Sequence, residues 1–187
     1  KRVDETSNIV DPHIWFGPQQ WLQGLKGVAN ELEQIAGLKG TLENYAAYKD
    51  EVDQMTKKLQ HDLDQYLPDS SKRILITSHD AFEYFGNAFG FKVRGLQGIS
   101  TAAEYGTKDV KNLVDFVITN QIKSVFVETS VSDKNLKAVI EAANARGYQL
   151  DIGGTLYSDA LGEEGRPSST YIGMLEANVN TIIKGLR

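Results

Sequence analysis

Two histidines and two carboxylates stand where this sequence could bind a metal ion. His13 directly precedes a predicted helix, and Asp159 lies in a loop rich in Gly, Ser and Glu. His79 and Glu128 lie at the ends of apolar runs that predict buried strands, and parallel strands bring their carboxyl ends to one edge of a sheet. The sequence contains no cysteine, so a metal here must be held by imidazole nitrogen and carboxylate oxygen, which suits zinc or manganese.

Each of these residues also has an ordinary structural interpretation. A histidine at a strand end is often a hydrogen-bonded part of the fold. Asp159 can be a turn residue, and Glu128 can cap the loop that follows it. His61, on the polar side of a long predicted helix, is expected to face solvent, and Trp15 and Trp21 are expected to pack in the core. The residues alone leave these alternatives open.

An alternation of strands and helices after Pro68 must position these groups. It predicts an α/β fold in which helices flank a parallel sheet, with right-handed crossovers. Asp80 or Ser78 is expected to cap the helix after the first strand, and residues 100–106 and 153–169 are expected to be loops. The strands are predicted at residues 74–77, 91–93, 124–128 and 148–152, and the helices at 81–89, 109–120, around 136–143 and at 171–186.

Two further helices are predicted ahead of the sheet. Apolar residues spaced by three or four predict a core-facing helix from Ile14 to Gly37, and a second from Thr41, as its cap, to Tyr66. The second helix would be roughly 39 Å long at the standard rise, longer than a small domain is wide. It could bridge two lobes or lie along both. A coiled coil is less favoured, because the apolar stripe lasts less than about four heptads.

The composition excludes several classes of function. A formal net charge of −5, from 25 acidic and 20 basic residues, argues against binding to nucleic acid or to an anionic membrane surface. No apolar run reaches the ~18 residues of a membrane span. The sequence also lacks the glycine-rich phosphate loops of nucleotide-binding proteins, the nucleophile elbow of hydrolases and the H-E-x-x-H zinc motif.

Five segments, taken in order, resemble the metal-binding solute receptors of bacterial ABC importers, the group that delivers manganese and zinc. The resemblance runs from about Val3 to Arg187. The segments are DPHIWF around His13, TSHDAFEYF around His79, GLQGIS at 95–100, FVETSV at 126–131 and GGTLYSDALG at 153–162.

The resemblance implies a two-lobed α/β fold in which a long backbone helix joins the lobes. Residues 1–40 would then be the remnant of an amino-terminal lobe, 41–67 the linking helix and 68–187 the carboxy-terminal α/β lobe. The family supplies another His upstream of the DPHIW segment. The chain is therefore expected to be a carboxy-terminal portion with an incomplete set of ligands.

The resemblance also implies the site and its role. His13, His79 and Asp159 look like ligands of one divalent ion, and Glu128 like a supporting or structural carboxylate. The protein would capture manganese or zinc outside the cytoplasm, in a periplasm or lipid-anchored at the outer face of the cytoplasmic membrane, and pass it to a membrane permease without turnover. Members dedicated to manganese often have Glu at the position of His79, so the identity of the metal stays open.

Two other functions fit the same residues. A metal-dependent hydrolase could use the three ligands and an open position to activate water, with Glu128 as the general base. A surface adhesin that binds a host protein is the third hypothesis, often proposed for this family.

Overall fold

A four-stranded parallel sheet lies at the centre of the described chain. The computed structural model describes residues 10–35, 38–99 and 106–187, and its strands are β1 (Ile74–His79), β2 (Lys92–Gln97), β3 (Ser124–Glu128) and β4 (Asp151–Leu156). Their order is β2-β1-β3-β4, with every neighbouring pair parallel. The α/β prediction is therefore confirmed. The chain runs from β1 to β2 on one side and then crosses back to β3 on the other side of β1, so the β1–β3 boundary is the switch point where such sheets bind ligands.

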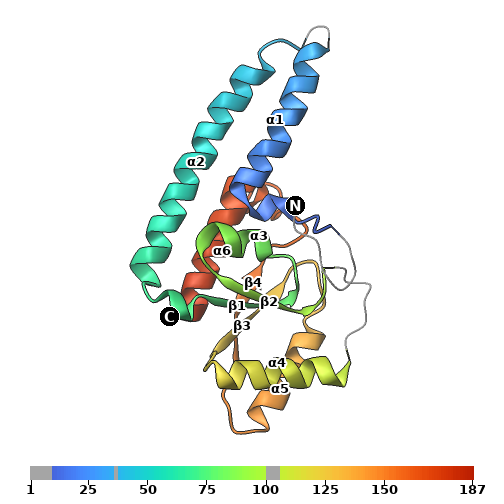
Figure 1. The fold of residues 1–187 in the computed structure, drawn as a ribbon, viewed down its shortest axis with the longest axis vertical. Helices are drawn as coiled ribbons and strands as arrows, with labels where there is room; N and C mark the ends of the chain where they lie inside the picture. The colour runs from blue at the N-terminus through green and yellow to red at the C-terminus, as the bar shows by residue number, and fades with distance from the viewer. Residues whose placement is uncertain (1–9, 36–37, 100–105) are drawn as a thin grey trace.

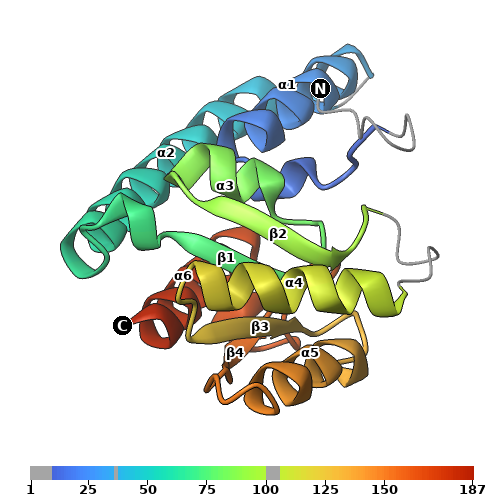
Figure 2. The ribbon, with the colours of Figure 1, turned by 60° about the horizontal axis from the view of Figure 1, so that its bottom comes forward.

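Helices lie on both faces of this sheet (Figure 2), and a hydrophobic core fills the space under each layer. Side chains of β1 and β3 alternate between the two cores: Leu75 and Phe126 enter one core, and Ile76, Val125 and Val127 enter the other. The second core is covered by α4 and α5, and the first by α3, α6 and the helix pair α1 and α2. The helices are α1 (Pro18–Gln34), α2 (Thr41–Tyr66), α3 (Glu83–Phe89), α4 (Thr107–Thr119), α5 (Lys134–Asn144) and α6 (Tyr171–Leu186).

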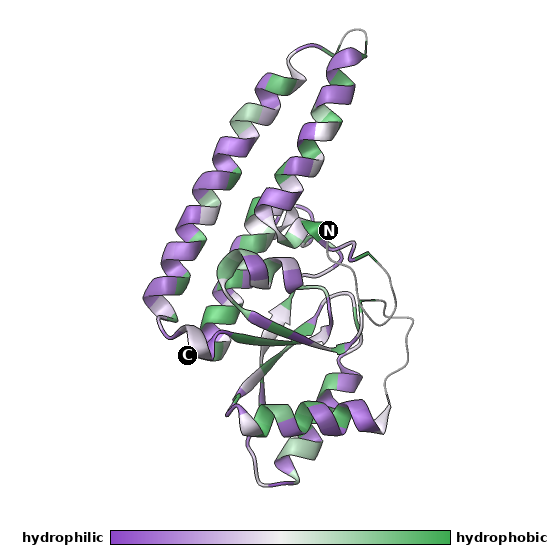
Figure 3. Cartoon of the chain, in the orientation of Figure 1, coloured by the Kyte–Doolittle hydropathy of each residue, from purple (hydrophilic) through white to green (hydrophobic). Residues whose placement is uncertain are grey.

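Helices α1 and α2 form a hairpin that projects past the sheet (Figure 1). The predicted stripe of α2 is buried at Val52, Met55, Leu59 and Leu63, but Leu42 is 40% exposed. Hydrophobic and hydrophilic residues alternate along the outer turns of the hairpin (Figure 3), and Val28 and Ile35 there are each 53% exposed. The core-facing prediction is therefore wrong at the outer end of the hairpin, where the two helices extend past α6.

The first predicted helix is divided in two. A short 3-10 helix, η1 (Ile14–Phe16), precedes α1, and extended backbone at Gly17 separates them. Pro18 occupies the first turn of α1, where its fixed φ is favourable and its missing N–H costs nothing. The expectation of one continuous helix from Ile14 to Gly37 is therefore wrong, and its last two residues lie outside the described chain.

The start of α2 is capped by a side chain from α1. Oε2 of Glu33 accepts hydrogen bonds from the N–H of Thr41 at 2.9 Å and from its hydroxyl at 2.5 Å, and Oε1 accepts one from the N–H of Gly40 at 3.4 Å. Thr41 is the first helical residue, and Gly40 is the cap with a positive φ of 86°. Thr41 was thus wrongly predicted as the cap, because the partner of the free N–H groups comes from another helix.

Arg73 joins the end of α2 to the sheet. Its buried guanidinium donates to the carbonyl of Leu67 at 2.9 Å, to that of Phe89 at 3.3 Å and to Asp64 at 2.7 Å. A short 3-10 helix, η2 (Ser70–Lys72), makes the turn between α2 and β1. Arg73, the residue before β1, is therefore hydrogen-bonded to the carboxyl ends of both α2 and α3.

Other element boundaries differ from the predictions. The α3 cap is Phe82, with no side-chain cap hydrogen bond, so the expectation of Asp80 or Ser78 is wrong. Strand β4 includes Gly153 and Gly154, which predicted a loop. Gly153 is needed in the strand because the ring of Phe126 packs against it, and a Cβ there would lie only 2.9 Å from that ring. The rest of the predicted loop contains a 3-10 helix, η3 (Pro167–Ser169), and most of the loop predicted at 100–106 lies outside the described residues.

No helix within residues 10–35, 38–99 and 106–187 has both the length and the apolar character needed to cross a bilayer.

Replacing Gly95 by Ala is expected to destabilise the fold by about 1–3 kcal/mol, the range for overpacking. A Cβ there would lie 2.5 Å from the backbone nitrogen of Asp80 and 2.6 Å from the carbonyl carbon of His79. Gly98→Ala is the control, since its Cβ meets no atom within 4 Å. Urea denaturation measures both variants, and equal stability would show that β2 does not approach β1 this closely.

Candidate metal centre

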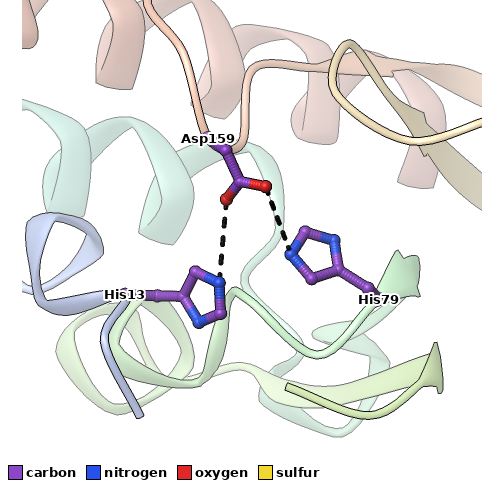
Figure 4. A group of neighbouring side chains, drawn as sticks. All are labelled: His13, His79 and Asp159. Atoms are coloured by element: carbon purple, nitrogen blue, oxygen red, sulfur yellow. Dashed lines mark ion pairs between the residues drawn. The ribbon is translucent and has the colours of Figure 1, made fainter. Parts of the chain in front are cut away.

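Three predicted ligands meet at the carboxyl edge of the sheet. His79 is the last residue of β1, Asp159 lies in the loop after β4, and His13 is the residue before η1. Each offers one ligand atom, and these atoms all lie within 4.8 Å of one another. Figure 4 shows the two rings on either side of the Asp159 carboxylate, each facing one of its oxygens.

The distances in this group suit a metal ion better than hydrogen bonds. Nε2 of His13 lies 3.7 Å from Oδ1 of Asp159, and Nε2 of His79 lies 3.7 Å from Oδ2. Both separations exceed hydrogen-bond length. Two ligands of a tetrahedral zinc ion with bonds near 2.1 Å would be about 3.4 Å apart. The three ligand atoms lie within 4.8 Å of one another, so the group would have to contract toward this spacing to place all of them around one ion.

Aromatic stacking brings the His13 segment to the sheet edge. Phe16, three residues after His13, is fully buried and stacks on Phe82, three residues after His79, with ring centroids 4.2 Å apart. The two imidazole rings consequently meet edge to face at 5.2 Å between centroids. Packing of two hydrophobic rings thus aligns two polar ones that are distant in the sequence.

His13 is oriented by Asp11. The carboxylate of Asp11 accepts a hydrogen bond from the backbone N–H of His13 at 3.0 Å and lies 2.7 Å from its Nδ1. The side chain of Asp11 is fully buried. Because Nδ1 faces this carboxylate, Nε2 is the ring nitrogen that could bind a metal. Asp11 was not singled out from the sequence, although an acid two residues before a candidate ligand could have indicated this role.

His79 is oriented by Glu128, across the boundary between β1 and β3. Oε1 of Glu128 accepts from the backbone N–H of His79 at 2.9 Å, and Oε2 lies 2.5 Å from Nδ1. Among the described residues, Nε2 of His79 has no hydrogen-bond partner although it is buried. A buried nitrogen left unpaired is costly, and a bound cation would remove that cost.

The charges around His79 oppose the effect of its burial. Burial lowers the pKa of its ring, but the hydrogen bond and charge of Glu128, with the charges of Asp159 and Asp80, raise it above the usual range. The carboxylates of Asp11, Glu128 and Asp159 all face the two imidazoles. An excess of negative charge therefore surrounds the space between the rings, which favours a divalent cation.

The three candidate ligands differ in exposure. The side chains of His13 and His79 are 5% and 1% exposed, whereas that of Asp159 is 39% exposed. Ser130, from the loop after β3, donates its hydroxyl to Oδ2 of Asp159 at 3.3 Å and contacts the hydroxyl of Ser158. The sequence analysis missed both serines, because nothing in the local pattern relates residue 130 to residue 158.

Two other sequence predictions are settled by their positions. His61 is exposed on α2, as predicted for a solvated residue. Trp15 and Trp21 are partly buried and pack against the first core, as predicted. Trp15 also donates a hydrogen bond to the carbonyl of Ser158, a contact that the helical pattern could not predict.

This fold and this convergence of side chains define a class of α/β proteins with a candidate metal centre at the carboxyl edge of a parallel sheet. The chain belongs to the family described as the periplasmic component A of the zinc-uptake complex, ZnuA, whose sequence model matches residues 1–185. The resemblance to metal-binding receptors of importers is confirmed. This is a family of metal-uptake components rather than enzymes.

Individual relatives support the same assignment. The manganese-binding lipoprotein MntA of Bacillus subtilis is 43% identical over 179 residues, 95% of this chain and 58% of that protein. The zinc-binding protein TroA of Treponema pallidum is 38% identical over 178 residues, 94% of this chain and 57% of that protein. The solved structure of TroA has a TM-score of 0.89 at 35% identity and covers 98% of this chain and 66% of that one. The chain thus spans less than two thirds of these relatives.

Replacing Glu128 by Gln is expected to lower the pKa of the His79 ring in metal-free protein. The substitution removes the carboxylate whose hydrogen bond and charge oppose burial. An NMR titration of the ring measures the pKa. Asp115→Asn is the control, because that carboxylate is half exposed and paired with Arg146. A pKa that stays or rises in Glu128→Gln would contradict this account.

The raised pKa of His79 determines how the stability of the metal-free protein changes with pH. In metal-free protein, His79 stabilises the fold fully below its unfolded pKa of about 6.5, and this contribution is lost as the pH rises through the raised folded pKa. An ion at Nε2 competes with the proton, so metal affinity should increase over the same rise in pH. As the pH rises across this range, denaturation should show a falling stability of the metal-free protein, and metal titration should show a rising affinity.

Proposed function

We propose that this protein captures zinc or manganese outside the cytoplasm and delivers it to the membrane permease of an ABC importer. One observation carries the proposal: each of two buried imidazoles faces an oxygen of the same carboxylate at 3.7 Å, too far for a hydrogen bond and close to the spacing of metal ligands. Membership of a family of uptake components supports the delivery step. The names of MntA and TroA support manganese and zinc as the transported ions.

We propose His13, His79 and Asp159 as the ligands of the transported ion. Glu128 and Asp11 would support them by holding each ring with Nε2 toward the ion and by making that nitrogen more basic. Three protein ligands leave further coordination positions, which water or another group can fill. Binding would release any proton from the rings, because only neutral imidazole donates to a metal.

The donor set accepts both metals. Nitrogen and oxygen ligands suit zinc and manganese, and thiolates, which would select strongly for zinc, are absent because the sequence has no cysteine. On affinity alone, zinc is expected to bind more tightly than manganese. Supply of the two ions would then decide which of them is carried.

Capture and release fit the position of Glu128 better than hydrolysis does. A hydrolase would need this carboxylate as a base beside the metal-bound water. Instead, Oε1 accepts from the N–H of His79 and Oε2 faces its Nδ1, on the side of the ring away from Nε2. The proposed role is therefore transport of an ion without chemical turnover.

The proposed organisation is that of a two-lobed receptor. Residues 1–40 would complete an amino-terminal lobe, 41–67 would link the lobes, and 68–187 would form the carboxy-terminal lobe. The projection of α2 past the sheet supports a linking role for that helix (Figure 1). The protein would act in the periplasm or from a lipid anchor at the outer face of the cytoplasmic membrane.

Removing a proposed ligand should weaken metal binding by at least about 100-fold, since loss of a supporting partner alone costs about 10- to 100-fold. Calorimetric titration of Zn²⁺ and Mn²⁺ into His79→Ala, His13→Ala and Asp159→Ala measures this. His61→Ala is the matched control, because that imidazole is exposed on α2. Wild-type affinity in His79→Ala would refute the site.

A further inference from the structure

We propose that Trp15 is a positioning residue for metal retention, because its indole N–H holds the loop of Asp159 against the segment that carries His13. The inference rests on the proposed function and extends it to a residue that is not itself a ligand. The hydrogen bond runs from Nε1 of Trp15 to the carbonyl of Ser158 over 3.0 Å, and it joins positions 143 residues apart.

Each of the two residues before Asp159 has a backbone hydrogen bond to another element. Tyr157 is clamped to α6 by Asn178, which accepts from its N–H at 2.9 Å and donates to its carbonyl at 2.8 Å. Ser158 is anchored to η1 by Trp15. Asp159 then projects between the two imidazoles. The Trp15 bond is therefore the last backbone anchor before the ligand.

Besides this backbone anchor, the Asp159 side chain has few contacts that fix its position. It is 39% exposed, and its described hydrogen bond is the one from Ser130 at 3.3 Å. An exposed carboxylate with one long hydrogen bond retains much of its rotational freedom. Fixing the backbone at Ser158 removes part of that freedom before the ion arrives, which slows loss of the ion afterwards.

Trp15 moves with His13 because the two residues belong to one turn. His13 is the cap of η1, and its ring meets that of Trp15 edge to face with centroids 5.3 Å apart. The next residue, Phe16, is fully buried and fixes this turn to the sheet edge. The Trp15 bond consequently sets the spacing between His13 and Asp159, two proposed ligands from opposite ends of the sequence.

A cavity beside the loop gives Asp159 room to leave. The cavity has a volume of about 250 Å³, and its walls include Trp15, Trp21, Leu161 and Asp159. While the indole N–H holds Ser158, the carboxylate stays at the rings. When that bond breaks, the loop can move into the cavity and one ligand is withdrawn from the ion.

Trp21 is a matched control for the indole N–H. It is also partly buried, lines the same cavity and stacks on Tyr171 with centroids 5.0 Å apart. Its N–H donates no hydrogen bond to residues 157–159. Tryptophan-to-phenylalanine changes at the two positions therefore remove similar ring area, but only one of them releases the loop.

The test measures metal release from the full chain. Zn²⁺ or Mn²⁺ is loaded, and its dissociation into excess chelator is followed by stopped flow. Trp15→Phe should release the ion about 5- to 10-fold faster, near the lower end of the effect of a lost supporting contact, with association changed less than about twofold. Trp21→Phe should behave like wild type.

A second arm separates positioning from general stability. In an Asp159→Ala background, Trp15→Phe should have no further effect on affinity, because the ligand that the bond positions is gone. If Trp15 only stabilised the fold, Trp15→Phe would weaken metal affinity in the Asp159→Ala background by the same factor as in the wild-type background. Should Trp15→Phe fail to fold, 3-benzothienylalanine at position 15 keeps the bicyclic ring and removes only the N–H donor.

The outcomes distinguish this inference from the proposed function. Release from Trp15→Phe as slow as from Trp21→Phe, or a full additional loss in the Asp159→Ala background, overturns the role of Trp15. Wild-type affinity in His79→Ala overturns the site itself. Faster release confined to Trp15→Phe, together with the missing effect in the double variant, supports the positioning role.

Discussion

The arrangement at the sheet edge depends on burying two imidazoles, each against its own carboxylate. A buried ring needs a polar neighbour for Nδ1, and the carboxylates of Asp11 and Glu128 lie against the two Nδ1 atoms. Once Nδ1 is occupied, each Nε2 is directed into the space beside Asp159. At the proposed metal site, an unpaired nitrogen and an excess of negative charge would therefore favour the binding of a cation.

The parallel sheet makes this pairing possible. Thr77 of β1 is in register with Phe126 of β3, so His79 and Glu128, each two residues further on, end on adjacent strands. This pair lies at the β1–β3 boundary, where the connection from β2 crosses β1 to reach β3 and the strand order reverses. The topology thus places an acid beside an imidazole with no contribution from a local motif.

Much of the fold was predictable because burial follows sequence periodicity. Strand β3 and helix α6 were predicted at their observed bounds, and helix α2 apart from its cap, since their apolar spacing reflects which face is covered. Partnerships across the chain were not predictable in this way. Glu33 caps a helix other than its own, and the glycine at 153 permits a ring from β3 to approach β4. Local signals gave the wrong interpretation at both places.

The candidate site likewise has a part that the sequence indicated and a part that it did not. His13, His79 and Asp159 were recognisable by residue type and motif, whereas the groups that orient them belong to contacts between distant segments. The two buried rings are held by packing and paired acids, and the third group is exposed on a loop. For the proposed role in capture and release, this difference matters, because three equally rigid ligands would hold the ion without a route for its release. Asp159 is the one of the three that can move without disturbing a core, so control of retention belongs with whatever anchors its loop.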